Sequence, residues 1–224
     1  MTKIKICGLR ESKHVSKAAS VGVDFVGFVF VPNVRREISI SQAHRIINEY
    51  RNLHGNTGPQ LVGLFANQPQ EHVNHIIDFC GLDMIQLCGN EEHEYWDEIT
   101  VPIIKQIKVT DNDSQGYTVS QTLAKVAKVV QHGHIPLLDK HESGSLGGTG
   151  LSFDWDIATH ISQHHDFILA GGLTPHNVGI ATSTVRPWGV DVSSGVEING
   201  TKNSHKIADF ANQVQITDKQ LFLD

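Results

Sequence analysis

The 224-residue sequence is poor in cysteine, proline and aromatic residues, and it carries no excess of positive charge. Its three cysteines are an odd number without a Cys-x-x-Cys pair, which excludes a disulfide-stapled scaffold and favours a reducing, cytoplasmic environment. Seven prolines beside 20 dispersed glycines exclude collagen-like and proline-rich classes. The net charge of −6 argues against binding to nucleic acid or to an acidic membrane, because both partners require a basic face.

Long apolar runs are also missing. The longest, residues 21–34, contains Asp24 and Asn33 and falls short of the roughly 20 residues that a membrane-spanning helix needs. The first ten residues contain no apolar stretch of signal-peptide length, so we expect neither a targeting segment nor a transmembrane helix. Apolar residues still make up 39% of the chain, which at this length suffices for one continuous core. We therefore expect a soluble globular protein.

Short β-branched or aromatic runs recur along the chain, each followed by a turn and a polar stretch with helical spacing. The runs FVGFVFV, LVGLF and FILAGG are continuously apolar, which is typical of parallel strands buried on both faces. The predicted strands are residues 3–7, 24–31, 60–66, 84–87, 103–107, 135–139, 167–170 and 189–192. The predicted helices lie near residues 11–20, 40–51, 69–79, 91–98, 118–130, 153–163, 175–182 and 203–215.

Eight strand–helix units predict an α/β fold, a single-domain (β/α)₈ TIM barrel over residues 1–224, with a doubly wound open sheet as the alternative. No linker or charge block divides the chain, and residues 110–116 are read as a long polar connection. Closure is favoured because Cys7, Asp139 and the glycine-rich segments fall at the carboxyl ends of predicted strands, where barrels carry their active sites.

Three glycine-bearing loops follow the last three predicted strands: GGTG at 147–150, GGLTP at 171–175 and DVSSG at 191–195. Glycine lets backbone N–H groups approach an anion closely, and a helix N-terminus, expected here at Thr174-Pro175, adds unpaired donors. Many barrels hold phosphate on the loops after strands seven and eight. The sequence thus predicts a phosphate site there; plain turn chemistry is the alternative.

Cys7 ends the first predicted strand and Asp139 the sixth, so both face the same barrel mouth. An accessible thiolate can act as a base, and a desolvated carboxyl group can donate a proton. The alternatives are a small buried side chain for Cys7 and a capping carboxylate for Asp139. Arg35 and Arg36 follow the second strand, where a guanidinium can fork onto a carboxylate or lie on the surface as a solvated pair.

Fourteen histidines raise the question of a metal site. His72 with His75, and His160 with His164, share helix faces, but no third ligand completes a recognisable set. We therefore expect solvated helix faces and no metal.

The order and spacing of several short segments resemble the phosphoribosylanthranilate isomerase family from one end of the chain to the other. The segments are KICGL at 5–9, GFVF at 27–30, REIS at 36–39, QLCG at 86–89, LD at 138–139 with GGTG at 147–150 and FDW at 153–155, AGGL at 170–173 and DVSSGVE at 191–197.

The resemblance implies a (β/α)₈ enzyme of tryptophan biosynthesis that rearranges N-(5-phosphoribosyl)anthranilate to the carboxyphenylamino-deoxyribulose phosphate without a cofactor. It makes Cys7 the general base, Asp139 the general acid and Arg36 the contact of the anthranilate carboxylate, and it turns Asp191 toward the sugar. The expected partner is a small-molecule phosphosugar, with no nucleic acid or membrane, and the expected state is a monomer or weak homodimer. The substrate phosphate falls on Gly171, Gly172, Ser193, Ser194 and Gly195.

The sequence departs from the family pattern twice. Residues 34–37 read VRRE where the family usually has SPRY, so Arg35 can share the carboxylate, and Cys88 stands where the family commonly has histidine. Other readings are a histidine-pathway ribonucleotide isomerase, which usually has an aspartate in place of Cys7, and indole-glycerol-phosphate synthase, whose lysine and glutamate set is not found. A non-catalytic phosphosugar-binding barrel is a further alternative, against which the pair of Cys7 and Asp139 argues.

The two proposed proton carriers pose a protonation problem. A free cysteine titrates near about 8.5 and a free aspartate near about 3.9, so the majority forms at neutral pH are the reverse of a base and an acid. We expect desolvation at the mouth to raise the pKa of Asp139 and nearby donors to lower that of Cys7.

Overall fold

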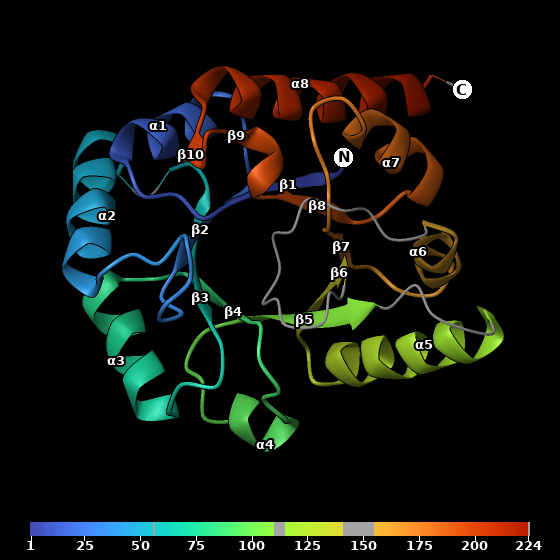
Figure 1. Cartoon of the computed structure of the whole chain (residues 1–224), viewed down its shortest axis with the longest axis horizontal. Helices are drawn as coiled ribbons and strands as arrows, with labels where there is room; N and C mark the ends of the chain where they lie inside the picture. The colour runs from blue at the N-terminus through green and yellow to red at the C-terminus, as the bar shows by residue number, and fades with distance from the viewer. Residues whose placement is uncertain (56, 110–114, 141–154, 224) are drawn as a thin grey trace.

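The computed structural model describes residues 1–55, 57–109, 115–140 and 155–223. Within them, eight parallel strands close into a barrel in chain order, with β8 paired to β1, and helices surround it (Figure 1). The strands are β1 (Lys3–Cys7), β2 (Phe25–Val29), β3 (Gln60–Phe65), β4 (Met84–Leu87), β5 (Ile103–Val109), β6 (Ile135–Lys140), β7 (Ile168–Leu169) and β8 (Gly189–Val192). The helices are α1 (Ser12–Ser20), α2 (Ile40–His54), α3 (Gln70–Cys80), α4 (His93–Trp96), α5 (Gln115–Gln131), α6 (Trp155–Ser162), α7 (Val178–Val185) and α8 (Ser204–Leu221).

The helices form where apolar residues repeat every three to four positions. In α2, Ala43, Ile46, Ile47 and Tyr50 are buried on one face, which packs toward the barrel. The side chain of Ser39 caps the helix by accepting from the backbone N–H of residue 42 at 3.2 Å. The chain leaves the helix at residue 55, a glycine with φ of +63°, a conformation that side chains disfavour.

Strand alternation divides the buried side chains into two layers. In β1, Ile4 and Ile6 belong to the layer between the strands and the helices, whereas Cys7 packs with the apolar residues inside the barrel. The interior layer includes Val62 on β3 and Leu137 on β6, which come from strands that are not neighbours in the ring. An end-of-strand residue on the interior face therefore points into the barrel mouth.

The predicted (β/α)₈ barrel is confirmed, and the open sheet is wrong because β1 and β8 pair directly. Each predicted strand and helix is present; their ends shift by three residues or fewer, except that α8 continues to Leu221, six residues beyond its predicted end. Among the described helices, none is long and apolar enough to cross a membrane. Residues 110–114 of the predicted long connection and the GGTG segment at 147–150 lie outside the described residues.

Two details around the last strands differ from the expectation. Helix α7 begins at Val178 and not at Thr174-Pro175, because the side chain of Asn177 accepts from the backbone N–H of Thr174 at 2.7 Å and closes a turn first. After β8 the chain also forms a short 3₁₀ helix, η1 (Ser194–Val196), and a two-stranded hairpin of β9 (Glu197–Ile198) and β10 (Thr201–Lys202). The hairpin was not predicted.

Candidate active site

Cys7 is the last residue of β1 and only 5% exposed. Gly8 follows at φ of +78°, and its N–H donates to the carbonyl of Gly27 at 2.9 Å, which fixes the end of β1 against β2. A Cβ atom on Gly8 would lie 2.6 Å from Cδ of Arg36. Glycine here therefore serves two needs, a left-handed turn and the passage of the Arg36 side chain over the backbone directly after the thiol.

A buried ion pair lies inside the barrel on the same strand face as Cys7. Nζ of Lys5 is 2.9 Å from Oδ1 of Asp191 on β8, and the lysine side chain is 1% exposed. Burial alone would lower the pKa of Lys5, but Asp191 and the neighbouring Cys7 thiol together raise it above its ordinary value. Lys5 is therefore a fixed positive charge. Sequence reasoning missed it, although its position two residues before Cys7 is the period-two signal for an interior residue.

The electrostatic surroundings of Cys7 oppose one another. Burial raises the pKa of its thiol, Lys5 lowers it, Asp191 raises it, and Lys202 and Arg36 lower it. Burial wins, so the pKa of Cys7 stands above its ordinary value. The neighbouring cations lower the pKa as expected, but they only partly offset the loss of water, which the expectation for Cys7 did not include.

Arg36 lies in an ion cluster around Glu197. Its Nε donates to Oε1 of Glu197 at 2.6 Å and its Nη2 to Oε2 at 3.1 Å, while Nζ of Lys202 donates to Oε1 at 2.8 Å. Nη2 of Arg35 donates to Oε2 at 2.8 Å, but this side chain is 57% exposed against 13% for Arg36. The solvated-pair reading is thus wrong for Arg36. Neither Glu197 nor Lys202 was predicted as part of the site, although Glu197 ends the DVSSGVE segment that resembles the family.

Burial alone would raise the pKa of Glu197, but the hydrogen bonds from Arg36 and Lys202 lower it below its ordinary value. Burial lowers the pKa of Lys202, and Glu197 opposes that shift without overcoming it. The two cations therefore favour the ionised carboxylate of Glu197 against the cost of its burial.

The glycine loops after β7 and β8 meet beside the end of β1. Gly171 and Gly172 both have positive φ, and a Cβ atom on Gly195 would overlap the carbonyl oxygen of Leu173, so the two loops touch backbone to backbone. The hydroxyl of Ser193 donates to the carbonyl of Cys7 at 3.1 Å. Ser193, like the next two residues, is half-buried. The structure thus brings the predicted phosphate loops together next to the thiol.

Asp139 lies near the end of β6 and is 8% exposed. Nε2 of Gln106, on the neighbouring strand β5, donates to its Oδ2 at 2.7 Å. The Oε1 atom of Gln106 is buried and has no hydrogen-bond partner among the described residues. Asp139 is therefore held by a polar interior neighbour that sequence reasoning did not identify, and it lies at the same end of the barrel as Cys7.

Cys88, at the position where the family commonly has histidine, follows β4 and packs in the interior layer with Cys7. Its backbone N–H donates to the carbonyl of Phe65 at 2.8 Å, and its Sγ accepts from Nε2 of Gln86 at 3.3 Å. Burial raises the pKa of this thiol to about 12. Cys88 is thus a neutral interior side chain near neutral pH.

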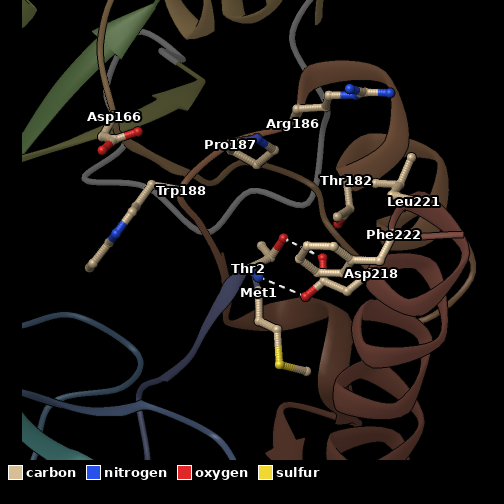
Figure 2. A pocket seen from close by; sticks show the side chains of 10 residues that line it. All are labelled: Met1, Thr2, Asp166, Thr182, Arg186, Pro187, Trp188, Asp218, Leu221 and Phe222. Atoms are coloured by element: carbon tan, nitrogen blue, oxygen red, sulfur yellow. Dashed lines mark hydrogen bonds between the residues drawn. The ribbon is translucent and has the colours of Figure 1, made fainter. Parts of the chain in front are cut away.

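A pocket of about 330 Å³ opens at the opposite end of the barrel (Figure 2). It is lined by residues that precede β1 and β8, including Met1, Thr2 and Trp188, and by the end of α8. The backbone N–H and hydroxyl of Thr2 each donate to the carboxylate of Asp218 at 2.7 Å. Because Cys7 lies at the carboxyl end of β1, this pocket is separate from the candidate active site.

A closed (β/α)₈ barrel with a thiol, a carboxylate and two glycine loops at its carboxyl-end mouth belongs to the large class of barrel enzymes that act on small phosphorylated molecules. The family model described as N-(5'phosphoribosyl)anthranilate (PRA) isomerase matches residues 4–213. The chain belongs to this family. It is an isomerase of tryptophan biosynthesis, as the resemblance predicted.

Individual relatives agree with the family model. The N-(5'-phosphoribosyl)anthranilate isomerase of Dehalococcoides mccartyi is 39% identical over 218 residues, which cover 97% of this chain and 98% of that protein. A structure of monomers generated from the dimeric Thermotoga maritima enzyme has a TM-score of 0.78 and 29% identity, covering 96% and 99% of the two chains. A phosphoribosylanthranilate isomerase in complex with reduced 1-(o-carboxyphenylamino)-1-deoxyribulose 5-phosphate has a TM-score of 0.77 and 29% identity, with the same coverage.

Proposed function

We propose that Cys7 is the general base and Asp139 the general acid in the rearrangement of N-(5-phosphoribosyl)anthranilate to 1-(2-carboxyphenylamino)-1-deoxyribulose 5-phosphate. The observation that carries this assignment is the presence of a buried thiol and a buried carboxyl group at the same barrel mouth, beside the two glycine loops. Each group is oriented by its own neighbours, Gln106 for Asp139 and the β1–β2 contact for Cys7.

The reaction needs one proton delivered and one removed. A protonated Asp139 gives its proton to the ribose ring oxygen as the bond from that oxygen to carbon 1 breaks, and the anilino nitrogen forms a Schiff base with carbon 1. The Schiff base acidifies carbon 2, and the thiolate of Cys7 takes the proton from this carbon to give the enolamine. The enolamine becomes the ketone when carbon 1 gains a proton and the hydroxyl group on carbon 2 loses one, and transfer of a proton back from Cys7 to Asp139 restores the starting forms of the acid and the base. No redox cofactor is required, because no electrons leave the substrate.

The two anionic ends of the substrate are proposed to hold the reacting carbons between the acid and the base. Arg36 binds the anthranilate carboxylate, and Asp191, oriented by Lys5, faces the sugar. The complex of a related enzyme with a reduced phosphosugar analogue supports a small-molecule phosphosugar as the ligand. The phosphate lies on the backbone of the loops after β7 and β8, at Gly171, Gly172, Ser193, Ser194 and Gly195.

The same proposal covers the setting of the protein. All three cysteines are free, which supports a reducing cytoplasm, and the net charge of −6 supports neither a nucleic-acid nor a membrane partner. Residues 1–224 are proposed to form one domain that works as a monomer or weak homodimer. The monomers generated from a dimeric relative support both states for this fold.

The loss of substrate fluorescence on addition of the protein tests the activity, and Cys7→Ala tests the base. We expect this variant to lose turnover but still to bind the reduced product analogue, because the thiol removes a proton and does not anchor either end. Cys80→Ala is the matched control, since Cys80 is a buried thiol at the end of α3, outside the mouth. Wild-type rates in Cys7→Ala would exclude the proposed base.

A further inference from the structure

Glu197 is contacted by cations from two segments that are far apart in the sequence. Arg36 and Arg35 come from the loop after β2, and Lys202 lies opposite Glu197 in the β9–β10 hairpin. In Figure 1 this hairpin lies beside the α1 and β1 side of the barrel, above the strand that carries Cys7. The Glu197 side chain is only 5% exposed, so the ion pairs of the cluster meet at a buried carboxylate and not at the solvent-exposed surface.

The contact between Glu197 and Arg36 is a two-point fork. Nε and Nη2 of the guanidinium each donate to a different carboxylate oxygen, at 2.6 and 3.1 Å. A fork of this kind fixes the plane of the guanidinium as well as its position, which a single hydrogen bond does not. The stem of Arg36 is fixed in addition where its Cδ crosses Gly8. The edge of the guanidinium that carries Nη1 is not used by this fork.

The cluster keeps a positive charge although it contains a carboxylate. The half-buried Arg36 and the buried Lys202 share the one negative charge of Glu197, and Arg35 adds a third cation at the rim. Arg36 can therefore still attract an anion. The lowered pKa of Glu197 means that the carboxylate stays ionised across the neutral range.

Glu197 also connects the two anion-binding ends of the proposed site. Nζ of Lys202, which donates to Glu197, donates to the carbonyl of Ser193 at 2.7 Å and lies 3.2 Å from its hydroxyl. One carboxylate thus ties the arginine proposed for the substrate carboxylate to the loop proposed for the phosphate. Because Lys202 has two acceptors at Ser193 besides Glu197, we expect it to keep its contact with that loop when the charge of Glu197 is removed.

We propose that Glu197 is a positioning residue of the isomerase: it orients Arg36 through the fork so that the free edge of the guanidinium faces the substrate carboxylate. This inference rests on the proposed role of Arg36. Burying an ion pair adds little net stability, so the main effect of the cluster is on orientation.

The test compares Glu197→Gln with wild type in KM and kcat. We expect KM to rise about tenfold and kcat to stay within about threefold, because the glutamine loses one charged acceptor of the fork and the carboxylate of the substrate is remote from the reacting carbons. Glu197→Asp keeps the negative charge but has a shorter side chain, and its KM should lie between those of the wild type and Glu197→Gln. Glu37→Gln is the matched control: Glu37 is an exposed carboxylate on the same loop as Arg36, and it only caps the backbone of Asn33.

Two further readouts separate positioning from a general structural effect. Inhibition by ribose 5-phosphate, which lacks the anthranilate carboxylate, should be unchanged in Glu197→Gln. The double variant Glu197→Gln with Arg36→Ala should be no worse than Arg36→Ala alone, because Glu197 acts through that arginine. The inference would be overturned if the fold increase in KM of the double variant equalled the product of the fold increases in the two single variants. Weaker binding of ribose 5-phosphate to Glu197→Gln would overturn it as well.

The outcomes also separate this inference from the proposed function. If Arg36→Ala leaves KM unchanged, the proposed carboxylate contact is wrong. If Arg36→Ala raises KM but neither Glu197→Gln nor Glu197→Asp does, the contact stands and Glu197 does not position it. Should Glu197→Gln fail to fold, the KM of Glu197→Asp and of its double variant with Arg36→Ala decides the question in the same way.

Discussion

Replacing Lys5 by methionine removes a buried cation while keeping most of the side-chain volume. Lys5 is fully enclosed in the barrel, and its Nζ lies 2.9 Å from the Asp191 carboxylate, which is also buried. The variant therefore leaves a carboxylate without its ion-pair partner. Breaking a buried pair in this way costs about 3–5 kcal/mol. Since a domain is stable by about 5–15 kcal/mol, we expect Lys5→Met to fold but to lose a large share of its free energy of unfolding.

A paired variant tests whether the cost comes from the uncompensated charge. Lys5→Met with Asp191→Asn removes both charges, and we expect it to be more stable than Lys5→Met alone. The measurement is urea unfolding of the wild type, the two single variants and the double variant at pH 7. The reasoning is refuted if Lys5→Met costs less than about 1 kcal/mol, or if the double variant loses the sum of the two single losses.

The same substitution has a separate effect on the thiol. Lys5 is the cation that most strongly lowers the pKa of Cys7 against burial, so its loss should move the titration of Cys7 to higher pH. The rate of alkylation by iodoacetamide against pH reports this titration directly. A Cys80→Ala, Cys88→Ala background leaves Cys7 as the one thiol in the chain. An unchanged titration would show that Lys5 does not act on the thiol.

Further predictions concern the other site residues and the response to pH. We expect the coupled pair of Cys7 and Asp139 to give a bell-shaped pH–rate profile, and Asp139→Asn should cut turnover sharply and remove one limb of it; an unchanged bell would make Asp139 a structural residue. Arg36→Ala should raise KM more than it lowers kcat. An unchanged KM would assign the contact with the substrate carboxylate to Arg35 instead. In thermal unfolding, stability should fall as pH drops below 6.5, because burial lowers the pKa of His14 and the unfolded chain then binds the proton more strongly. It should also fall as pH rises above 9.0, because burial raises the pKa of Cys88 to about 12 and that of Cys80 to about 11, and Cys88→Ala should reduce this alkaline loss without abolishing it.

Much of the fold was predictable because its signals are local. Continuous apolar runs such as LVGLF mark strands covered on both faces, and eight of them separated by helical patterns leave few topologies open. The start of α7 was placed wrongly, since the Asn177 turn that precedes it depends on one side-chain contact. Each strand of the β9–β10 hairpin is only two residues long, which is too short to show a periodic pattern in the sequence.

The site residues that could be predicted are those whose location follows from their position along a strand. Cys7 and Asp139 could be placed at the mouth because each ends an apolar run, and their roles remain proposals. The period-two position of Lys5 marks it as an interior residue, but its pairing with Asp191 and the fork between Glu197 and Arg36 could not be identified in this way, because each joins residues far apart in the sequence. The bond from Lys5 to Asp191 spans 186 positions in the sequence. Such contacts follow from barrel closure and from no local motif.

The charges around Cys7 connect binding with chemistry. The whole chain carries a net charge of −6, which opposes the approach of a substrate with a phosphate and a carboxylate. At the mouth the balance is reversed, because the cations Lys5, Lys202 and Arg36 act on the thiol against the carboxylate of Asp191. The same cations that attract the anionic ends also favour the thiolate that the reaction needs. A variant that removes one of them should therefore weaken both functions, and the relative losses in KM and in the pH profile show which of the two that cation serves more.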